Sequence, residues 1–231
     1  MDNKTIPIKI LYEDNHLLVL NKQAGQIVQG DKTGDKPMSE LIKDYLRIEY
    51  NKPGNIFAGV VHRIDRPVTG VVVFAKTSKA LTRMNEMFQL KQIKKTYWAV
   101  VCNKPKQDKG LLKEYLFKNE KLNKSFVTDE KDSRASLSEL EYKLLGASDK
   151  YFLLDVNPLT GRHHQIRVML AHMGCPIKGD VKYGAPRTNA DGSIHLHAHT
   201  ITFMHPVKKE EIKITAPPPD DAVWNYFAKY K

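Results

Sequence analysis

The 231-residue chain is poor in cysteine, with Cys102 and Cys175 alone and no Cys-x-x-Cys pair. It therefore lacks both a disulfide framework and the cysteine spacing of a structural zinc site. No apolar run approaches the roughly 20 residues that span a bilayer. The N-terminal MDNKTIPIKI lacks the basic, apolar and small-residue order of a signal peptide. These absences favour a soluble, cytoplasmic protein.

The motifs of several enzyme classes are missing as well. The chain contains no Walker loop, G-x-G-x-x-G, H-E-x-x-H or G-x-S-x-G, and its serine and histidine positions single out no catalytic triad. Enzymes that use nucleoside triphosphates or dinucleotides are therefore disfavoured, and no cofactor is expected.

Basic residues outnumber acidic ones by 37 to 26, which gives a formal charge of +11. This excess favours a polyanionic partner, either nucleic acid or an acidic membrane surface. Residues 87–134 hold 12 Lys and Arg against 6 Asp and Glu, interrupted by aromatics such as Phe88, Tyr97, Trp98 and Tyr115. The segment is either a solvated surface hairpin or a surface that follows a phosphate backbone and stacks bases. Charge alone does not decide between the two.

The order of apolar patterns predicts an α+β fold. Strand-type runs over 8–13 and 16–22 flank a turn, and 71–76 has the continuous apolar character of a strand covered on both faces. Helical spacing begins at Met38, and Ser78 is placed to N-cap a second helix. Strands and helices do not alternate strictly, so a mixed sheet with flanking helices is favoured over a doubly wound fold.

The segment His62-Arg63-Ile64-Asp65-Arg66 places a carboxylate between two guanidinium groups, in a loop that precedes a buried strand. The neighbouring charges favour the ionised form of Asp65. An ionised carboxylate is a competent nucleophile when it is held in place and partly desolvated. The alternative is an ordinary loop ion pair, which contributes little.

A second polar cluster lies at 157–167, in a helix predicted to start after the Thr160-Gly161 turn. Projecting this helix puts Arg162 on its apolar side and Arg167 on the flank. An arginine directed inward near a helix start requires an anion, either a side chain or a phosphate. The alternative is that it snorkels to the surface. The GDVKYG segment that follows is typical of a turn that admits a close backbone approach.

Three histidines alternate along one predicted strand, at His195, His197 and His199. Alternate residues share a face of a strand, so the three imidazoles could converge on a metal ion. Metal hydrolases normally add a nearby aspartate ligand and another histidine, whereas this strand continues as an ordinary half-buried one. Structural or surface histidines are therefore the favoured interpretation, and no metal is expected.

Five segments in one order together resemble the RluA-type family of pseudouridine synthases. HRIDRPVTGVVVFAKT (62–77), which contains Asp65, is similar to the family's catalytic motif. KKTYWAVV (94–101) resembles its tyrosine motif, and 158–184 resembles its arginine motif with the Gly-Asp-Tyr-Gly segment. The opening 10–28 and the strand at 196–206 resemble its first and last motifs. A single HRxD sequence is weak support, whereas five motifs in family order are specific.

The resemblance implies a pseudouridine-synthase-like fold. This is a mixed, mostly antiparallel sheet with flanking helices and a central RNA-binding cleft, in one catalytic domain over residues 1–231. The family often carries an N-terminal S4-type RNA-binding module, for which the early first motif leaves no room. Gln23 stands where the family usually has proline, and this departure is expected to loosen the turn.

The resemblance also implies a reaction, in which a uridine of folded RNA is isomerised without metal, redox agent or nucleotide. The C1′–N1 bond breaks, the bound base rotates, and C1′ is rejoined to C5. Asp65 would start the cleavage by attack on C1′, attack on C6 or removal of a ribose proton. Arg167 would pair with Asp65, with Arg162 as the second choice, and Tyr97 would stack on the uracil and take the C5 proton. The nucleotide must be flipped out of its stack, and Arg63 would fill the vacated place.

The implied substrate is structured RNA, a ribosomal or transfer RNA stem-loop, bound by a monomer without a protein or membrane partner. The residues expected to contact it are basic or polar neighbours of the catalytic positions: Arg63, His62, Arg66, Lys91, Lys94, Lys95, Arg162 and Gln165. Two other classes are weaker. An RNA-binding module with idle catalytic residues would bind RNA without converting uridine, and a metal hydrolase would need zinc on the histidine strand.

Overall fold

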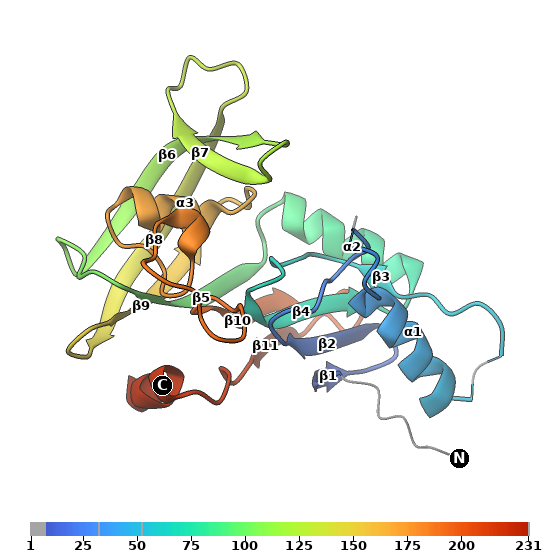
Figure 1. Cartoon of the computed structure of the whole chain (residues 1–231). Helices are drawn as coiled ribbons and strands as arrows, with labels where there is room; N and C mark the ends of the chain where they lie inside the picture. The colour runs from blue at the N-terminus through green and yellow to red at the C-terminus, as the bar shows by residue number, and fades with distance from the viewer. Residues whose placement is uncertain (1–7, 32, 52, 231) are drawn as a thin grey trace. The chain divides into compact units, whose positions relative to one another are not determined.

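The computed structural model describes residues 8–31, 33–51 and 53–230, and the chain divides into two compact units. Unit 1 comprises Met1–Lys94 and Ala198–Pro217, and unit 2 comprises Lys95–His197 and Pro218–Lys231. Both units are built on antiparallel strands with helices against them (Figure 1). The predicted α+β class, with a mostly antiparallel sheet and flanking helices, is confirmed.

Unit 1 contains the hairpin predicted at the start of the chain, formed by β1 (Ile10–Glu13) and β2 (Leu17–Lys22). β2 pairs with β4 (Thr69–Ala75), as does the short β3 (Gly59–Val60). β10 (Leu196–Met204) pairs with β11 (Glu211–Thr215). Every residue of β2 and β4 is buried, which confirms that this strand pair is covered on both faces.

The helices of unit 1 are α1 (Met38–Glu49) and α2 (Ser78–Gln89), and each buries one apolar side. Met84 of α2 packs into a core made of alternate residues from β2, β4, β10 and β11. The N-cap of α2 is Thr77, whose hydroxyl oxygen accepts a hydrogen bond from the N–H of Ala80. Ser78 was the predicted cap, and the adjacent hydroxyl residue takes that place because its backbone is extended.

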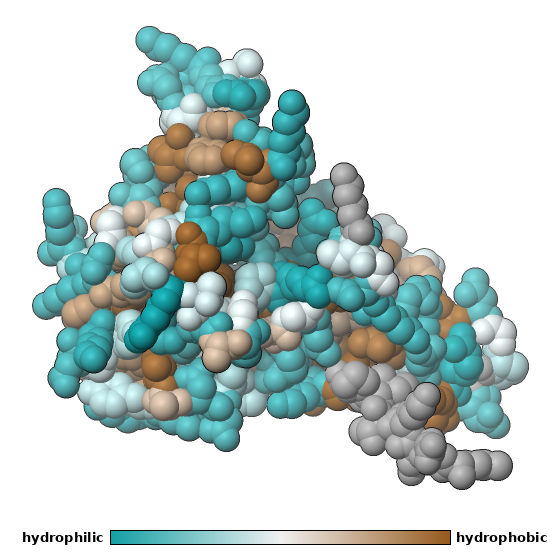
Figure 2. Space-filling model, in the orientation of Figure 1, coloured by the Kyte–Doolittle hydropathy of each residue, from teal (hydrophilic) through white to brown (hydrophobic). Residues whose placement is uncertain are grey.

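Unit 2 is a sheet whose order is β5, β9, β8, β6 and β7, with every neighbouring pair antiparallel. The strands are β5 (Lys94–Val101), β6 (Lys109–Asn119), β7 (Lys124–Thr128), β8 (Ser136–Ala147) and β9 (Phe152–Pro158). The basic segment 87–134 therefore includes the β6–β7 hairpin. The connection from β7 to β8, at the top of Figure 1, is covered with hydrophilic side chains in Figure 2.

The helices of unit 2 follow β9 and β11. They are α3 (Gln165–His172), the 3-10 turn η1 (Val181–Tyr183), α4 (Ala222–Phe227) and the 3-10 turn η2 (Ala228–Tyr230). α4 packs Trp224 and Phe227 against Trp98 and Val100 of β5. Because strand side chains alternate, Tyr97 points to the opposite face of β5. No helix in the described part of the chain is long and apolar enough to cross a membrane.

Candidate active site

Asp65 lies on a tight turn at the entrance to β4. The N–H of Val68 donates to the carbonyl of Asp65 (3.0 Å), which closes the turn, and the chain enters the buried strand at Thr69. Ile64 and Val68 are buried on either side of the half-buried Asp65. The turn therefore presents a partly desolvated carboxylate on a backbone that its neighbours fix.

Gly70 determines how the strand continues after this turn. Its φ of +114° lies in the region that favours glycine, and a Cβ atom there would collide with the backbone of Ala198 in β10. The glycine of the predicted catalytic motif thus allows close approach of two strand backbones in unit 1.

A buried lysine holds the Asp65 turn in place. Lys22, the last residue of β2, is fully buried, and its Nζ donates to the carbonyls of Gln23 (3.1 Å), Arg66 (3.0 Å) and Val68 (2.7 Å). Burial lowers the pKa of Lys22 to about 7; the Asp65 carboxylate opposes this shift and Arg66 adds to it. Lys22 was not among the predicted site residues, although a lysine ending a continuous apolar strand signals a buried polar partner.

Replacing Lys22 by Met should remove a pH dependence from the free energy of unfolding. The folded-state pKa of Lys22, about 7, lies below that of an unfolded lysine, so the unfolded state binds more protons between these values. Stability due to this group is therefore lowest near neutral pH and rises with pH. We expect urea unfolding to show about 2 kcal/mol more stabilisation between pH 7 and pH 9 in the wild type than in the variant.

The matched control for this prediction is Lys213→Met, an exposed lysine of β11 in the same unit. It should keep the wild-type pH dependence. Equal pH dependence in Lys22→Met and the wild type would show that Lys22 does not titrate in this range.

The turn after β2, where Gln23 takes the place of the family's usual proline, contains several hydrogen bonds. The N–H of Gln23 donates to Oε1 of Gln26 (2.8 Å), and its Nε2 donates to the carbonyl of Asn21 (2.9 Å). The N–H of Gly25 donates to the carbonyl of Arg66 (3.0 Å), which ties this turn to that of Asp65. Side-chain amides thus supply the restraint that a proline ring would supply covalently.

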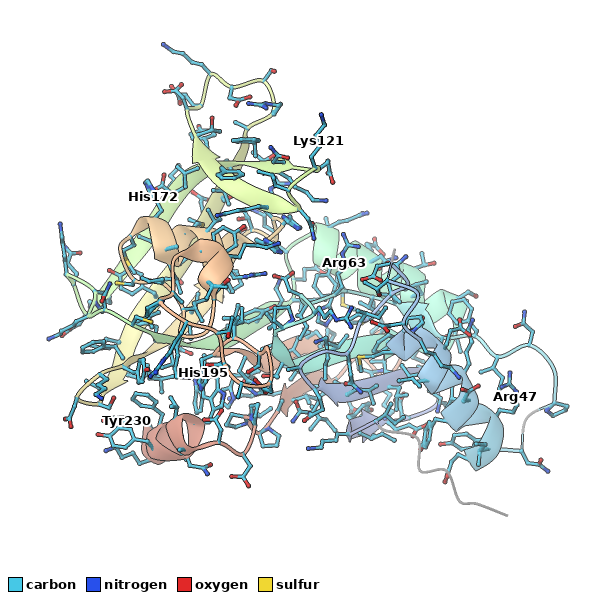
Figure 3. All side chains as sticks on the ribbon, in the orientation of Figure 1. Arg47, Arg63, Lys121, His172, His195 and Tyr230 are labelled. Carbon is cyan, nitrogen blue, oxygen red and sulfur yellow. The ribbon has the colours of Figure 1, made fainter. Side chains whose placement is uncertain are left out.

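Five basic residues predicted to bind RNA are accessible: Arg63, Arg66, Lys91, Lys94 and Arg162. Arg63 is labelled in Figure 3. The guanidinium of Arg66 forms a surface ion pair with Asp35. Such exposed ion pairs are weak, so phosphates can compete for the arginine.

Three other predicted RNA contacts are buried or half-buried. Nε2 of His62 accepts a hydrogen bond from the N–H of Val73 (3.1 Å). Gln165 is 4% exposed, and its Oε1 accepts from the hydroxyl of Thr160 (2.7 Å). Burial lowers the pKa of the half-buried Lys95. Gln165 and His62 thus have hydrogen-bond partners within the fold, and their contacts with RNA stay predictions.

Tyr97 lies in β5 opposite Val156 of β9 and is half-buried. Its neighbour Trp98 is 3% exposed and packs against α4. Strand alternation therefore separates the two aromatic residues. Trp98, predicted as a possible stacking platform, belongs to the core, whereas Tyr97 lies on the other face of the strand.

Arg167 is the inward-facing arginine of the second polar cluster. It is 5% exposed, and its Nε and one terminal nitrogen donate to the two carboxylate oxygens of Asp180 (2.7 and 2.8 Å). Its guanidinium also lies 5.1 Å from the ring centroid of Tyr183. Arg162 is exposed, so the prediction that it faces inward is wrong. α3 begins only at Gln165, and Arg162 precedes the helix to which the projection was applied.

The segment that contains Asp180 and Tyr183 is hydrogen-bonded to the β6–β7 hairpin. The hydroxyl of Tyr183 accepts a hydrogen bond from the N–H of Ser125 in β7 (2.9 Å). Nζ of Lys182 donates to the carbonyl of Asn123 in the hairpin turn (3.1 Å). Lys121 extends from the same turn (Figure 3). Hydrogen bonds therefore connect the basic β6–β7 hairpin to the segment that contains Asp180 and Tyr183.

The histidines at the start of β10 have core contacts. His195 is 3% exposed, its Nε2 lies 3.3 Å from the carboxylate of Asp221, and its ring stacks on Trp224 at 5.2 Å. His197 packs against the same indole at 5.9 Å. Within residues 8–31, 33–51 and 53–230, no three His, Cys, Asp or Glu side chains are placed to hold a metal ion.

Comparison with known proteins shows to which family the chain belongs. Residues 16–172 match the family described as RNA pseudouridylate synthase. The chain belongs to this family. The RluA-type resemblance of the five motifs is thereby confirmed.

Relatives of the chain include bacterial proteins named ribosomal large subunit pseudouridine synthase C. The chain is 35% identical over 216 residues to ribosomal large subunit pseudouridine synthase C of Buchnera aphidicola, and 34% identical over 214 residues to that of Vibrio parahaemolyticus. Both matches cover 90% of this chain but 66% and 65% of the relative. The chain thus spans slightly under two thirds of their length.

Solved structures show the pseudouridylate synthase fold. Human RNA pseudouridylate synthase domain containing 4 matches with a TM-score of 0.79 and 24% identity, over 95% of this chain and 92% of that one. Human RNA pseudouridylate synthase domain containing 1 matches with a TM-score of 0.74 and 21% identity, over 97% and 89%. In this chain, Asp65 belongs to unit 1, whereas Tyr97 and Arg167 belong to unit 2.

Proposed function

We propose that the protein is an RNA pseudouridine synthase, an isomerase that converts specific uridines of structured RNA to pseudouridine. The observation that carries the proposal is the Asp65 turn, which lies inside the segment that matches the family. Two carbonyl contacts of the buried Lys22, to Arg66 and Val68, and the Gly25 hydrogen bond support that turn. They keep a half-buried carboxylate in a fixed position, as a nucleophile or an initiating base requires.

The reaction needs no co-reactant. The C1′–N1 bond breaks and a C1′–C5 bond forms, while N1 gains a proton and C5 loses one, so substrate and product are isomers. We assign the start of cleavage to Asp65 and removal of the C5 proton to Tyr97. A tyrosine has an ordinary pKa near 10, so Tyr97 needs help from its surroundings to act as a base. We assign the stabilisation of Asp65 to Arg167. The ion pair with Asp180 orients the guanidinium of Arg167.

The proposed substrate is ribosomal RNA, with transfer RNA as the second candidate. The names of the bacterial relatives support ribosomal RNA, and the net charge of +11 supports a large polyanion. The protein would act in the cytoplasm as a monomer, with both units forming one catalytic domain. Because the target atoms are inaccessible in a base stack, the uridine would be flipped out, and Arg63 would fill its place.

Exchanging Lys91 and Lys94 together for Gln should weaken binding to all RNAs and flatten its salt dependence. Both lysines are exposed and lie just before Tyr97, whereas Lys95 is half-buried and is left unchanged. Each lost phosphate contact lowers the slope of log affinity against log salt by roughly 0.7–0.9. A salt titration with a stem-loop RNA measures this slope. Lys213→Gln is the control, and an unchanged slope in the double variant would place the RNA elsewhere.

Tyr97→Phe should keep base stacking and RNA affinity but slow pseudouridine formation at least about a hundredfold. The ring remains, whereas the hydroxyl that takes the C5 proton is lost. Single-turnover conversion of a bound stem-loop measures the effect. Tyr115→Phe, in β6 of the same unit, is the control. Normal turnover of Tyr97→Phe would reduce the role of Tyr97 to stacking.

The proposed function is tested by the fate of the hydrogen on C5. RNA transcribed with uridine tritiated at C5 should release tritium to water in the presence of the protein, in equal amount to the pseudouridine formed. Tight RNA binding without tritium release from any ribosomal or transfer RNA would instead support a binding module with idle catalytic residues.

A further inference from the structure

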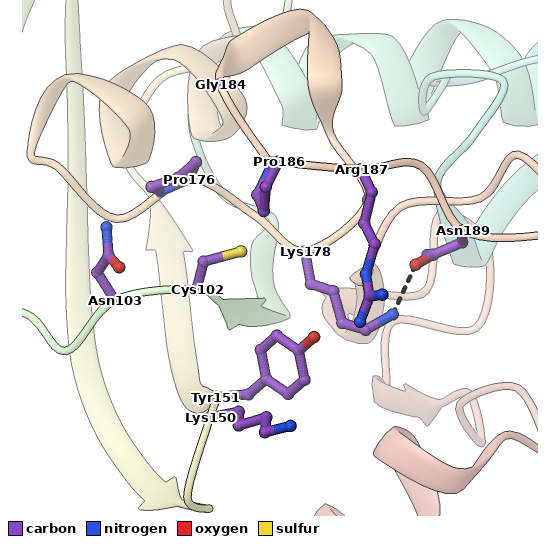
Figure 4. Close-up of a pocket in the computed structure, with 11 residues that line it drawn as sticks. Cys102, Asn103, Lys150, Tyr151, Pro176, Lys178, Gly184, Pro186, Arg187 and Asn189 are labelled. Carbon is purple, nitrogen blue, oxygen red and sulfur yellow. Dashed lines mark hydrogen bonds between the residues drawn. The ribbon is translucent and has the colours of Figure 1, made fainter.

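Unit 2 contains a cationic pocket that the catalytic assignment does not use. It encloses about 310 Å³ and is lined by Lys150, Lys178, Arg187, Tyr151 and Cys102, among others (Figure 4). None of the described residues that line it is acidic. Three cations therefore share one small pocket without a carboxylate in its wall.

None of Asp65, Tyr97 and Arg167 is among the described residues that line the pocket. Cys102 directly follows β5, and its N–H donates to the carbonyl of Pro176 (2.9 Å). A ligand in this pocket would therefore not be the uracil on which Tyr97 acts.

Lys178 is fixed in the pocket wall by a chain of polar contacts. Its Nζ donates to Oδ1 of Asn189 (2.6 Å), drawn as the dashed line in Figure 4. Nδ2 of Asn189 donates to the carbonyl of Ser193 (2.9 Å) and lies 2.9 Å from Nδ1 of His195. His195 in turn contacts Asp221, the N-cap of α4. The ammonium of Lys178 is thus held by the side-chain amide of Asn189, which in turn contacts Ser193 and His195.

This arrangement fits a phosphate. Like charges in one pocket repel each other, and an anion bound between them offsets this repulsion. The charged ends of Lys178 and Arg187 extend toward the same side of the pocket (Figure 4). A planar guanidinium with an ammonium is the pair that proteins use for phosphate oxygens. The Lys178 ammonium lies over the Tyr151 ring, 5.7 Å from its centroid, so an anion held by Lys178 would lie beside this aromatic side chain.

We propose that this pocket, here named the Lys178 pocket, binds the phosphate of a nucleotide. The source is either a phosphodiester of the bound RNA or the phosphomonoester of a free mononucleotide. Lys178 and Arg187 hold the phosphate oxygens, and Tyr151 lies beside the bound anion. Binding requires neither Asp65 nor Tyr97, so the inference stands independently of the catalytic assignment.

Cys102 reports occupancy of the pocket. Its thiol lines the pocket and is half-buried, whereas Cys175 is 2% exposed. Alkylation of Cys102 by iodoacetamide is measured by peptide mass spectrometry in the full chain, at constant ionic strength set with chloride. The probes are inorganic phosphate, uridine monophosphate and a stem-loop RNA. At ten times its dissociation constant, a probe should slow alkylation about tenfold.

Protection should disappear in Lys178→Met/Arg187→Gln and persist in Lys106→Gln, an exposed lysine outside the pocket. Protection by RNA identifies a backbone phosphate as the ligand, and protection by uridine monophosphate but not RNA identifies a free nucleotide. Absence of protection by all three probes, or equal protection in the double variant, overturns the proposal. Asp65→Asn should keep protection, so failure of the proposed function would leave this test intact.

Discussion

Asp65→Asn should reduce pseudouridine formation by at least about a thousandfold and leave the fold and RNA affinity largely unchanged. Asparagine keeps the size of the side chain but lacks the negative charge that, in the proposed mechanism, starts the cleavage. The turn should persist, because its hydrogen bonds come from the N–H of Val68 and the ammonium of Lys22 to backbone carbonyls. Single-turnover assays, circular dichroism and RNA binding measure the three quantities.

Asp35→Asn is the matched control, since Asp35 is an exposed carboxylate that pairs with Arg66 next to the turn. Its turnover should stay close to that of the wild type. Activity of Asp65→Asn above about a tenth of wild type would contradict the assignment of Asp65 as the initiating group.

Arg167→Met should cost about 3–5 kcal/mol of stability and also abolish measurable turnover. The substitution leaves the carboxylate of Asp180, which is 2% exposed, buried without the bidentate partner seen in the structure. Replacing both members of a buried ion pair by apolar residues is often nearly neutral, because no charge is then left unpaired. Arg167→Met/Asp180→Leu should therefore regain most of the stability.

The double variant separates the two roles of Arg167. Urea unfolding should show recovery, while pseudouridine formation should remain absent, because the guanidinium that we propose stabilises Asp65 is still missing. If turnover returned together with stability, Arg167 would serve folding alone. A single variant as stable as the wild type would show that the pair with Asp180 contributes little.

The parts of the fold that are local in sequence could be predicted. The continuous apolar runs of β2 and β4 and the helical spacing from Met38 report burial directly, because side-chain period follows backbone conformation. The start of α3 could not, since it depends on His164 in the left-handed region, with φ of +53°, and on the amide of Gln165 reaching Thr160. Because α3 begins later than predicted, Arg167 is buried and Arg162 is exposed, which is the reverse of the prediction.

The polar partners of the site were the least predictable part. Lys22 binds a carbonyl that lies 44 residues further along the chain, and Arg167 binds an aspartate 13 residues away. Neither pairing produces a periodic pattern in the sequence. The sequence indicated that an inward arginine needs an anion, and the structure identifies Asp180 as one. In the same way, His62 and Gln165 were expected to contact RNA as neighbours of the catalytic positions, but their hydrogen bonds to the fold depend on tertiary structure.

The central claim is tested most directly by mapping pseudouridine in total RNA from cells with and without this protein, and again after adding purified protein to the RNA that lacks it. We predict that one or more uridines in ribosomal or transfer RNA stem-loops lose the modification in the absence of the protein. Wild-type protein should restore it, and Asp65→Asn should not. Identical maps in both cell types, or equal restoration by Asp65→Asn, would contradict the account.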